Sequence, residues 1–311
     1  MTVGWPLFGH GLAEQRFLDA YNQTRLHHAW LIEGPEGIGK SRLARRLAAF
    51  LMGARGPADA PLDADEADPV WRAFTSGGHP DVRLVHRELN EKGKLAQDIS
   101  VDQIRALTDF FTKKAALGGW RVGIIDAIDE TNKSGANALL KTLEEPPEKC
   151  VLFLINHGRE PLLPTIRSRC RVLRLAPLSD EDCQHALDAA GAPAQATRLA
   201  QGRPGKGIRL STQTALAASD AARTLLRAMP NLSEKLVMPA LSAATADDAS
   251  LEAFRSELAA WLADRAETDP AAARLWLKQA RINGEAEQLN MDAAQVAAKL
   301  VAGLYELAQP V

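Results

Sequence analysis

The residues best suited to chemistry form one octapeptide, GPEGIGKS, at positions 34–41. Glycines at this spacing let the backbone curl so that successive amide groups point at a single anion. The lysine reaches the β- and γ-phosphates of a nucleotide, and the serine after it ligates Mg²⁺. An apolar run at 29–33 precedes the octapeptide and a helical pattern follows it, which is the context that a phosphate-binding loop requires. We therefore expect ATP with Mg²⁺ to bind at Gly34, Gly37, Gly39, Lys40 and Ser41.

A carboxylate, Asp126, ends a later apolar run. At the carboxyl end of a strand beside a phosphate loop it is well placed to hold Mg²⁺ through water; the alternative is a solvated aspartate that ends a buried strand. ATPases with a DExx motif carry glutamate at the next position to polarise the attacking water, whereas this chain has Ala127. Asp129 and Glu130 compensate only if the local backbone differs. The sequence thus supports nucleotide binding better than hydrolysis.

Short apolar runs alternate with helical patterns over about the first 175 residues, which is typical of α/β proteins with a parallel sheet. Near-continuous apolar strands indicate a sheet that is covered on both faces. The expected strands are 29–33, 82–85, 121–126, 151–156 and a short one near 172–175. The expected helices are one that begins at Lys40, one over 101–114, and one over 134–143 that stops before Pro146 and Pro147.

Outside these elements the pattern changes. Residues 53–69 are rich in Ala, Asp, Pro and Gly and show no periodicity, so we expect an exposed acidic loop, ordered or disordered. A serine and three acids at 179–182 open a helix, and only helical patterns follow. One apolar stripe at helical spacing fits either an internal core or part of an assembly surface: Leu251, Phe254, Leu258, Trp261 and Leu262.

Composition excludes several classes of protein. The net charge of -2 argues against a polybasic nucleic-acid wrapper, and 46% hydrophobic with 24% charged residues excludes wholesale disorder. The three cysteines, Cys150, Cys170 and Cys183, are too scattered for a disulfide framework or a four-ligand zinc site. No signal peptide is visible, and no apolar stretch approaches about 18 residues. We expect a soluble, cytoplasmic protein without a membrane contact.

Several segments together resemble one family, the AAA+ subunits of the bacterial DNA polymerase III clamp loader. They are ANALLKTLEEPP at 136–147, SRC at 168–170, HHA at 27–29 and HPD at 79–81. The resemblance is strong over about residues 6–177 and weak beyond. Within the family, HPD, the segment 99–105 and LNMD at 289–292 favour the delta-prime type over the tau/gamma motor type.

The resemblance implies roles for two further residues. Arg169 in SRC matches the arginine finger, which reaches the ATP site of the adjacent subunit and stabilises charge on the transferred phosphoryl group. Asn156 falls at or next to the sensor-1 position, which reports on the γ-phosphate. The alternatives are a solvated basic edge for the arginine and an ordinary strand-end turn for the asparagine.

This chain departs from the family pattern in three places. Ala127 replaces the DExx glutamate. Gly205 stands where the sensor-2 arginine starts a lid helix, and whether Arg203 or Lys206 substitutes for that arginine is left open. Many clamp-loader subunits bind zinc through four cysteines in the region of 53–69, where this chain has none, so we expect no zinc.

The resemblance implies a RecA-like α/β P-loop (AAA+) domain over 1–176, a small helical lid over 177–217, and an all-α C-terminal collar over 218–311. It implies a pentameric complex with tau/gamma and delta subunits that loads the sliding clamp onto primed DNA. Weak or no intrinsic ATPase activity is expected, with no polymerase site. The competing classes are a free-standing AAA+ ATPase motor and a small-molecule P-loop kinase. A motor keeps the glutamate and the sensor-2 arginine, and a kinase carries an Arg-rich mobile lid.

Overall fold

The computed structural model describes residues 5–89, 93–289 and 291–308. Asn290, within the LNMD segment, lies outside these residues. The chain divides into two compact units, Met1–Ala189 and Ala190–Val311. The three-domain division stays a prediction, and its second boundary, 217/218, lies inside one helix of the second unit, Gln213–Arg227.

The first unit contains five strands and eight helical segments among its described residues. The strands are β1 (Ala29–Glu33), β2 (Val82–His86), β3 (Arg121–Asp126), β4 (Cys150–Asn156) and β5 (Arg171–Arg174). The helices are α1 (Gly11–Asn22), α2 (Lys40–Met52), α3 (Pro69–Thr75), α4 (Val101–Thr112), the 3₁₀ turn η1 (Ile128–Glu130), α5 (Lys133–Glu144), α6 (Pro164–Arg167) and α7 (Asp180–Ala189). The predicted strands and helices are all present, with ends that differ by one or two residues.

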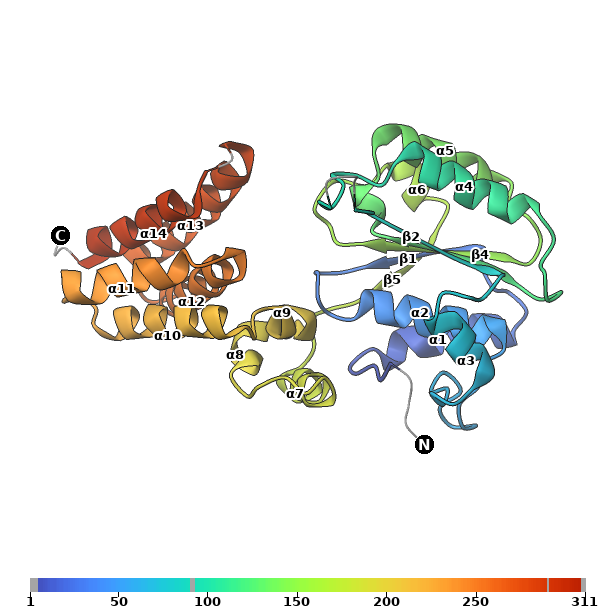
Figure 1. Cartoon of the computed structure of the whole chain (residues 1–311), viewed down its shortest axis with the longest axis horizontal. Helices are drawn as coiled ribbons and strands as arrows, with labels where there is room; N and C mark the ends of the chain where they lie inside the picture. Colours follow the sequence, from blue (N-terminus) through green and yellow to red (C-terminus); the bar gives the residue numbers. More distant parts are fainter. Residues whose placement is uncertain (1–4, 90–92, 290, 309–311) are drawn as a thin grey trace. The chain divides into compact units, whose positions relative to one another are not determined.

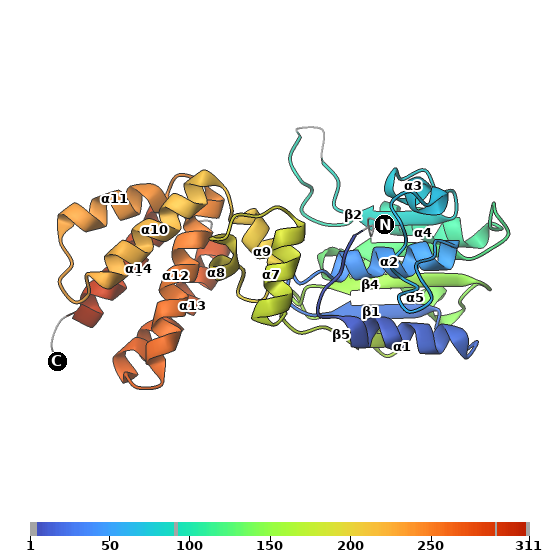
Figure 2. The same cartoon turned by 90° about the horizontal axis from the view of Figure 1, so that it is seen from below.

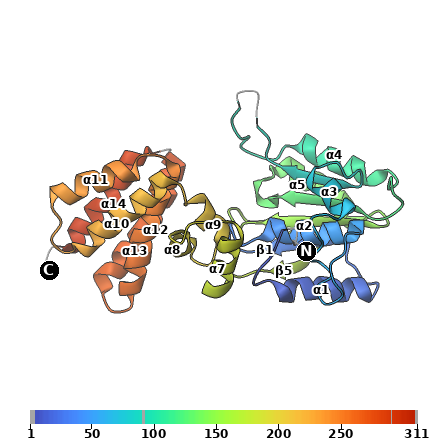
Figure 3. The ribbon, with the colours of Figure 1, turned by 60° about the horizontal axis from the view of Figure 1, so that its bottom comes forward.

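The sheet is parallel throughout, in the order β2-β3-β4-β1-β5. Helices α1, α2 and α3 cover one face, and α4, α5 and α6 cover the other (Figure 1). The view in Figure 3 shows α1 and α2 lying along the sheet on the first of these faces. Because every strand runs the same way, all five carboxyl ends meet at one edge, which we call the carboxyl edge, and all amino ends meet at the opposite amino edge. The predicted α/β P-loop fold is confirmed.

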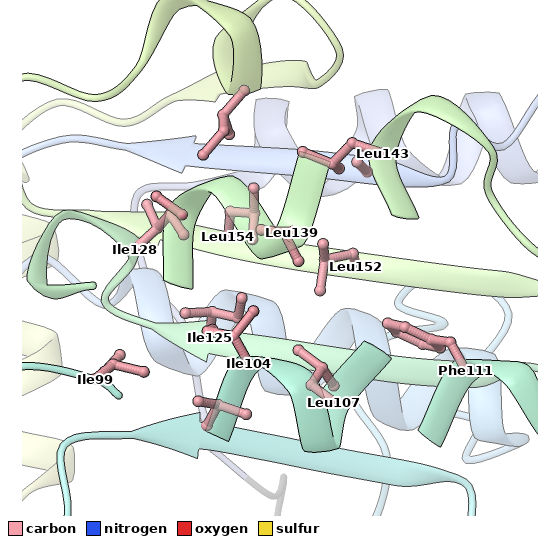
Figure 4. Packing of buried hydrophobic residues seen from close by; sticks show 14 of the residues in the cluster. Ile99, Ile104, Leu107, Phe111, Ile125, Ile128, Leu139, Leu143, Leu152 and Leu154 are labelled. Atoms are coloured by element: carbon pink, nitrogen blue, oxygen red, sulfur yellow. The ribbon is translucent and has the colours of Figure 1, made fainter. Parts of the chain in front are cut away.

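Apolar side chains of α4 and α5 pack onto β3 and β4 and hold these two helices against the sheet. Figure 4 shows Ile104 of α4 next to Ile125 of β3, and Leu139 of α5 next to Leu154 of β4, and each of the four is fully buried. Helix α4 begins at a capping box, in which Ser100 and Gln103 each accept a hydrogen bond from the other's backbone amide. The helix predicted at 101–114 is therefore formed as α4, with a capping box at its start and a buried apolar face.

The acidic segment before α3 is a loop, as predicted, but part of it packs against the domain. Leu62 and Ala64 are buried there. Asp63 forms an ion pair with Arg46 of α2, whose side chain is 2% exposed and also pairs with Glu14 of α1 at 2.9 Å. The expectation of an exposed loop is met at residues such as Asp59 and Glu66 and not at Leu62 to Ala64, because composition does not reveal a buried cation on another helix.

Among the described residues of the second unit, the regular elements are all helices. Its helices are α8 (Ala196–Ala200), α9 (Pro204–Arg209), α10 (Gln213–Arg227), α11 (Glu234–Ala244), α12 (Asp248–Ala266), α13 (Pro270–Leu289) and α14 (Ala293–Ala308), of which α10 to α14 form a bundle (Figure 2). The stripe on α12 faces the interior of this bundle: Phe254, Leu258 and Leu262 are fully buried, and Leu251 and Trp261 pack against the same cluster. Three residues of the stripe are therefore internal core, and Leu251 and Trp261 are only partly buried at its margin.

Candidate nucleotide-binding site

The phosphate loop connects β1 to α2 at the carboxyl edge. Gly34 has φ +151° and Gly39 has φ +102°, conformations that L side chains rarely adopt. A Cβ on Gly34 would lie 2.4 Å from the carbonyl oxygen of Leu175, so no larger residue fits there. The Nζ of Lys40 donates to the carbonyl oxygens of Gly34 at 2.5 Å and Pro35 at 2.6 Å. The loop thus curls around its lysine, as a phosphate cradle requires.

Burial changes the acid–base properties of Lys40, which is 2% exposed. Desolvation lowers its pKa to about 8, although the carboxylates of Asp129, Glu36 and Asp126 act in the opposite direction. The phosphate groups of a nucleotide would add negative charge beside the ammonium and restore its usual pKa. The site therefore gains electrostatically from an anion.

Asp126 lies beside Ser41, as the sequence predicts for two metal residues. Burial raises the pKa of Asp126, but the nearby His157 ring and the Ser41 hydroxyl stabilise the carboxylate and outweigh burial, and the pKa falls below its ordinary value. The Nε2 of His157 lies 3.6 Å from the Asp126 carboxylate, and the buried Nδ1 of the same ring has no hydrogen-bond partner among the described residues. An ionised carboxylate and a hydroxyl side by side are ligands that suit Mg²⁺.

The two acids that follow Ala127 are engaged elsewhere. Asp129 is buried and accepts hydrogen bonds from the backbone amides of His157 at 3.1 Å and Arg159 at 2.9 Å. Glu130 is paired with Arg159 at 2.6 Å and with Arg87 at 2.7 Å. Both carboxylates therefore hold protein groups, and neither stands in for the missing glutamate as a free base.

Asn156 ends β4 directly opposite Glu33, the last residue of β1, and so lies next to the start of the phosphate loop. The side chain of Asn156 is buried, and its Oδ1 accepts a hydrogen bond from the amide of Gly158 at 2.8 Å. The structure thus brings this residue to the same edge as Lys40 and Asp126.

Arg169 lies at the other end of the sheet. It precedes β5, whose first residue, Arg171, pairs with Trp30 near the amino end of β1. The guanidinium of Arg169 is 35% exposed, pairs with Glu144 at the end of α5 at 2.8 Å, and donates to the carbonyl of Thr165 at 2.9 Å. Arg169 is therefore separated from the phosphate loop of its own chain by the length of the strands.

The residues proposed as substitutes for the sensor-2 arginine lie in the second unit. Gly205 is inside α9, and Lys206 of the same helix is 7% exposed and donates to the Gln201 side chain at 3.1 Å. Burial, together with the neighbouring cation Arg203, lowers the pKa of Lys206 to about 8. Whether Lys206 or Arg203 takes the sensor-2 role stays an open prediction.

The sequence analysis missed the cluster that follows β4. No motif marks His157 and Arg159, which follow β4 and pair with Asp126 and with Glu36 of the phosphate loop. The available signal was position alone, because polar residues directly after a buried parallel strand face the ligand crevice.

The donors present fit a magnesium nucleotide: loop amides and Lys40 for the phosphates, and Ser41 with Asp126 for the ion. Over the described residues, no three His, Cys, Asp or Glu side chains gather as metal ligands, and the expectation of no zinc stays a prediction. A separate search of the same residues finds no helix with the length and apolarity needed to cross a bilayer.

Comparison with known proteins identifies relatives. A family model described as "DNA polymerase III, delta subunit" matches residues 9–179, more than half of the chain. The DNA polymerase III subunit delta' of Pseudomonas aeruginosa is 42% identical over 143 residues, which are 46% of this chain and 41% of that protein. The subunit delta' of Escherichia coli is 32% identical over 201 residues, which are 63% of this chain and 58% of that protein.

Among solved structures, a DNA polymerase III gamma subunit-related protein of Thermotoga maritima has 16% identity and a TM-score of 0.43, covering 91% of this chain and 95% of that one. The chain spans about half the length of the curated relatives that it matches. The matched residues contain the whole sheet, the phosphate loop and Arg169. On this match the chain belongs to the DNA polymerase III delta-subunit family.

Proposed function

We propose that this chain is a delta-prime-type subunit of the DNA polymerase III clamp loader, and that it helps load the sliding clamp onto primed DNA in the cytoplasm. Its partners would be tau/gamma and delta subunits, with clamp and DNA reached through the complex. The family match and the relatives named delta' support this assignment.

One observation carries the mechanistic part of the proposal: a complete phosphate loop lies beside Ala127, with both nearby acids engaged in other bonds. The chain binds ATP with Mg²⁺ through Gly34, Gly37, Gly39, Lys40 and Ser41, with Asp126 on the metal and Asn156 near the γ-phosphate. It turns that ATP over weakly or not at all, because Ala127 carries no carboxylate and neither Asp129 nor Glu130 is free to activate water.

The second part concerns the neighbouring subunit. The guanidinium of Arg169 lies partly exposed at the amino edge, where it pairs with Glu144 and also donates to the carbonyl of Thr165. Such a pair contributes little and exchanges readily. Across a subunit interface, the planar guanidinium of Arg169 is suited to stabilise charge on the γ-phosphoryl group of ATP held by a tau/gamma subunit.

Two measurements on the purified chain test the proposal. Titration of a fluorescent ATP analogue with Mg²⁺ should show saturable binding, and size-exclusion chromatography should show co-elution with tau/gamma and delta subunits. Absence of co-elution would contradict the clamp-loader assignment. Rapid ATP turnover by the chain alone would favour the competing function, a free-standing AAA+ motor.

A further inference from the structure

Arg159 joins two acidic side chains from separate elements at the carboxyl edge. One guanidinium nitrogen, Nη2, lies 2.6 Å from the carboxylate of Glu36 in the phosphate loop. The other, Nη1, lies 2.6 Å from the carboxylate of Glu130 in η1. This arginine therefore ties the phosphate loop to the segment that follows β3.

The backbone beneath Arg159 is fixed, whereas its side chain is half-exposed. The buried carboxylate of Asp129 accepts hydrogen bonds from the amides of both His157 and Arg159. The guanidinium itself is 47% exposed, so it is open to an incoming anion. A fixed backbone that carries an accessible cation is the arrangement expected of a residue that contacts a bound ligand.

The two carboxylates differ in how tightly they are held. Glu130 is 13% exposed and also pairs with Arg87 at 2.7 Å. Glu36 is 48% exposed and lies within the phosphate loop itself. Of the two, Glu36 is the acid that the phosphates of a nucleotide would confront directly, because it belongs to the loop that would bind them.

The charged side chains of this cluster act electrostatically on Lys40. Glu36 and Asp129 act to raise the pKa of the lysine, and Arg159 acts to lower it. Since Lys40 is the residue that contacts the β- and γ-phosphates in such loops, Arg159 lies within electrostatic range of the terminal phosphate position.

We propose that Arg159 is the residue by which this chain distinguishes a nucleoside triphosphate from a diphosphate. The inference rests on the proposed nucleotide binding. Without nucleotide, Glu36 neutralises Nη2. A γ-phosphate in the loop replaces Glu36 as the acceptor, while Glu130 keeps the other nitrogen in place. A diphosphate lacks that group and leaves the pair with Glu36 intact.

The test compares equilibrium affinities of the full-length chain for Mg²⁺-ADP and for a slowly hydrolysed ATP analogue, Mg²⁺-ATPγS. Arg159→Gln should weaken ATPγS binding by about tenfold, since it removes a charge-assisted hydrogen bond, and should change ADP binding less than about twofold. Glu36→Gln should strengthen ATPγS binding by about threefold, because it removes the competing acceptor. Arg87→Gln is the matched control: it also removes a partner of Glu130, and the ratio of the two affinities should stay unchanged.

Thermal melts of each variant establish that it folds. The two variants should change ATPγS affinity in opposite directions, Arg159→Gln weakening it and Glu36→Gln strengthening it, so the test stays decisive if one variant is unstable. Equal losses for both nucleotides, or no loss for either, would overturn the role of Arg159 while leaving nucleotide binding intact. A wild-type chain that binds neither nucleotide would instead overturn the proposed binding function itself, and this inference with it.

Discussion

The two edges of the sheet hold charged residues in opposite ways. At the carboxyl edge, Lys40, Asp129 and Glu130 are buried or nearly so, and each is held by several protein groups. At the amino edge, Arg169 is partly exposed, and its partners include the half-exposed Glu144 and the backbone carbonyl of Thr165. This contrast supports the proposals that the first edge binds a nucleotide and that the cation at the second edge acts on another molecule.

The comparison predicts that changes at the amino edge are silent in the isolated chain and strong in the complex. Arg169→Ala should leave folding and ATP binding by this chain unchanged. Hydrolysis at the neighbouring site that it serves should fall by about 10³-fold, because a transition-state cation is lost. The measurement is clamp- and DNA-stimulated ATPase activity of reconstituted complexes.

Arg171→Ala is the control for this experiment, since it removes a nearby exposed arginine outside the SRC motif. Arg169→Lys should rescue poorly, because a point charge lacks the planar fork of the guanidinium. Equal ATPase rates for wild-type and Arg169→Ala complexes would leave Arg169 as part of a solvated basic edge.

At the carboxyl edge, the largest loss should follow removal of the buried cation. Lys40→Ala should weaken Mg²⁺-ATP binding by about 100-fold, since the charge that balances the phosphates is gone. Lys141→Ala, an exposed lysine on α5, should have no effect. Fluorescence titration measures both, and an unchanged affinity for Lys40→Ala would place the nucleotide elsewhere.

The same lysine predicts a pH dependence. Its pKa of about 8 in the free chain means that Lys40 loses its proton as the pH rises through 8, and bound phosphate favours the protonated form. Affinity for Mg²⁺-ATP should therefore fall by about tenfold between pH 7 and pH 9. Lys40→Arg should remove this dependence, because arginine stays charged throughout the range. A flat profile for the wild type would show that Lys40 keeps its ordinary pKa.

The smallest effects concern stability. Asp129→Ala should lower the free energy of unfolding by about 2 kcal/mol, because two backbone amides lose their acceptor in a buried place. Glu144→Ala should change it by less than about 0.5 kcal/mol, since it removes one surface ion pair. Urea denaturation of the two variants provides the measurement. Equal losses would remove the distinction between the edges.

Local sequence patterns predicted much of this structure, but they could not predict which residues far apart in the chain form pairs. The phosphate loop, Asp126 and the strands follow from spacing and apolar runs, which are properties of neighbouring residues. The pair of Arg159 with Glu36 joins positions 123 residues apart, and the bond from Arg159 to Asp129 spans 30. Only the folded sheet brings such residues together. The packed acidic segment was missed for the same reason, because its partner Arg46 belongs to an earlier helix.

The central claim is that the chain holds ATP without consuming it. A single-turnover experiment tests this most directly: purified chain in excess over radiolabelled Mg²⁺-ATP, with bound nucleotide separated over time. We predict that the nucleotide bound at the phosphate loop is recovered as ATP after many minutes, because Asp129 and Glu130 are engaged and Ala127 carries no carboxylate. Conversion of bound ATP to ADP within seconds, lost in Lys40→Ala, would contradict this and would show that the chain is an ATPase in its own right.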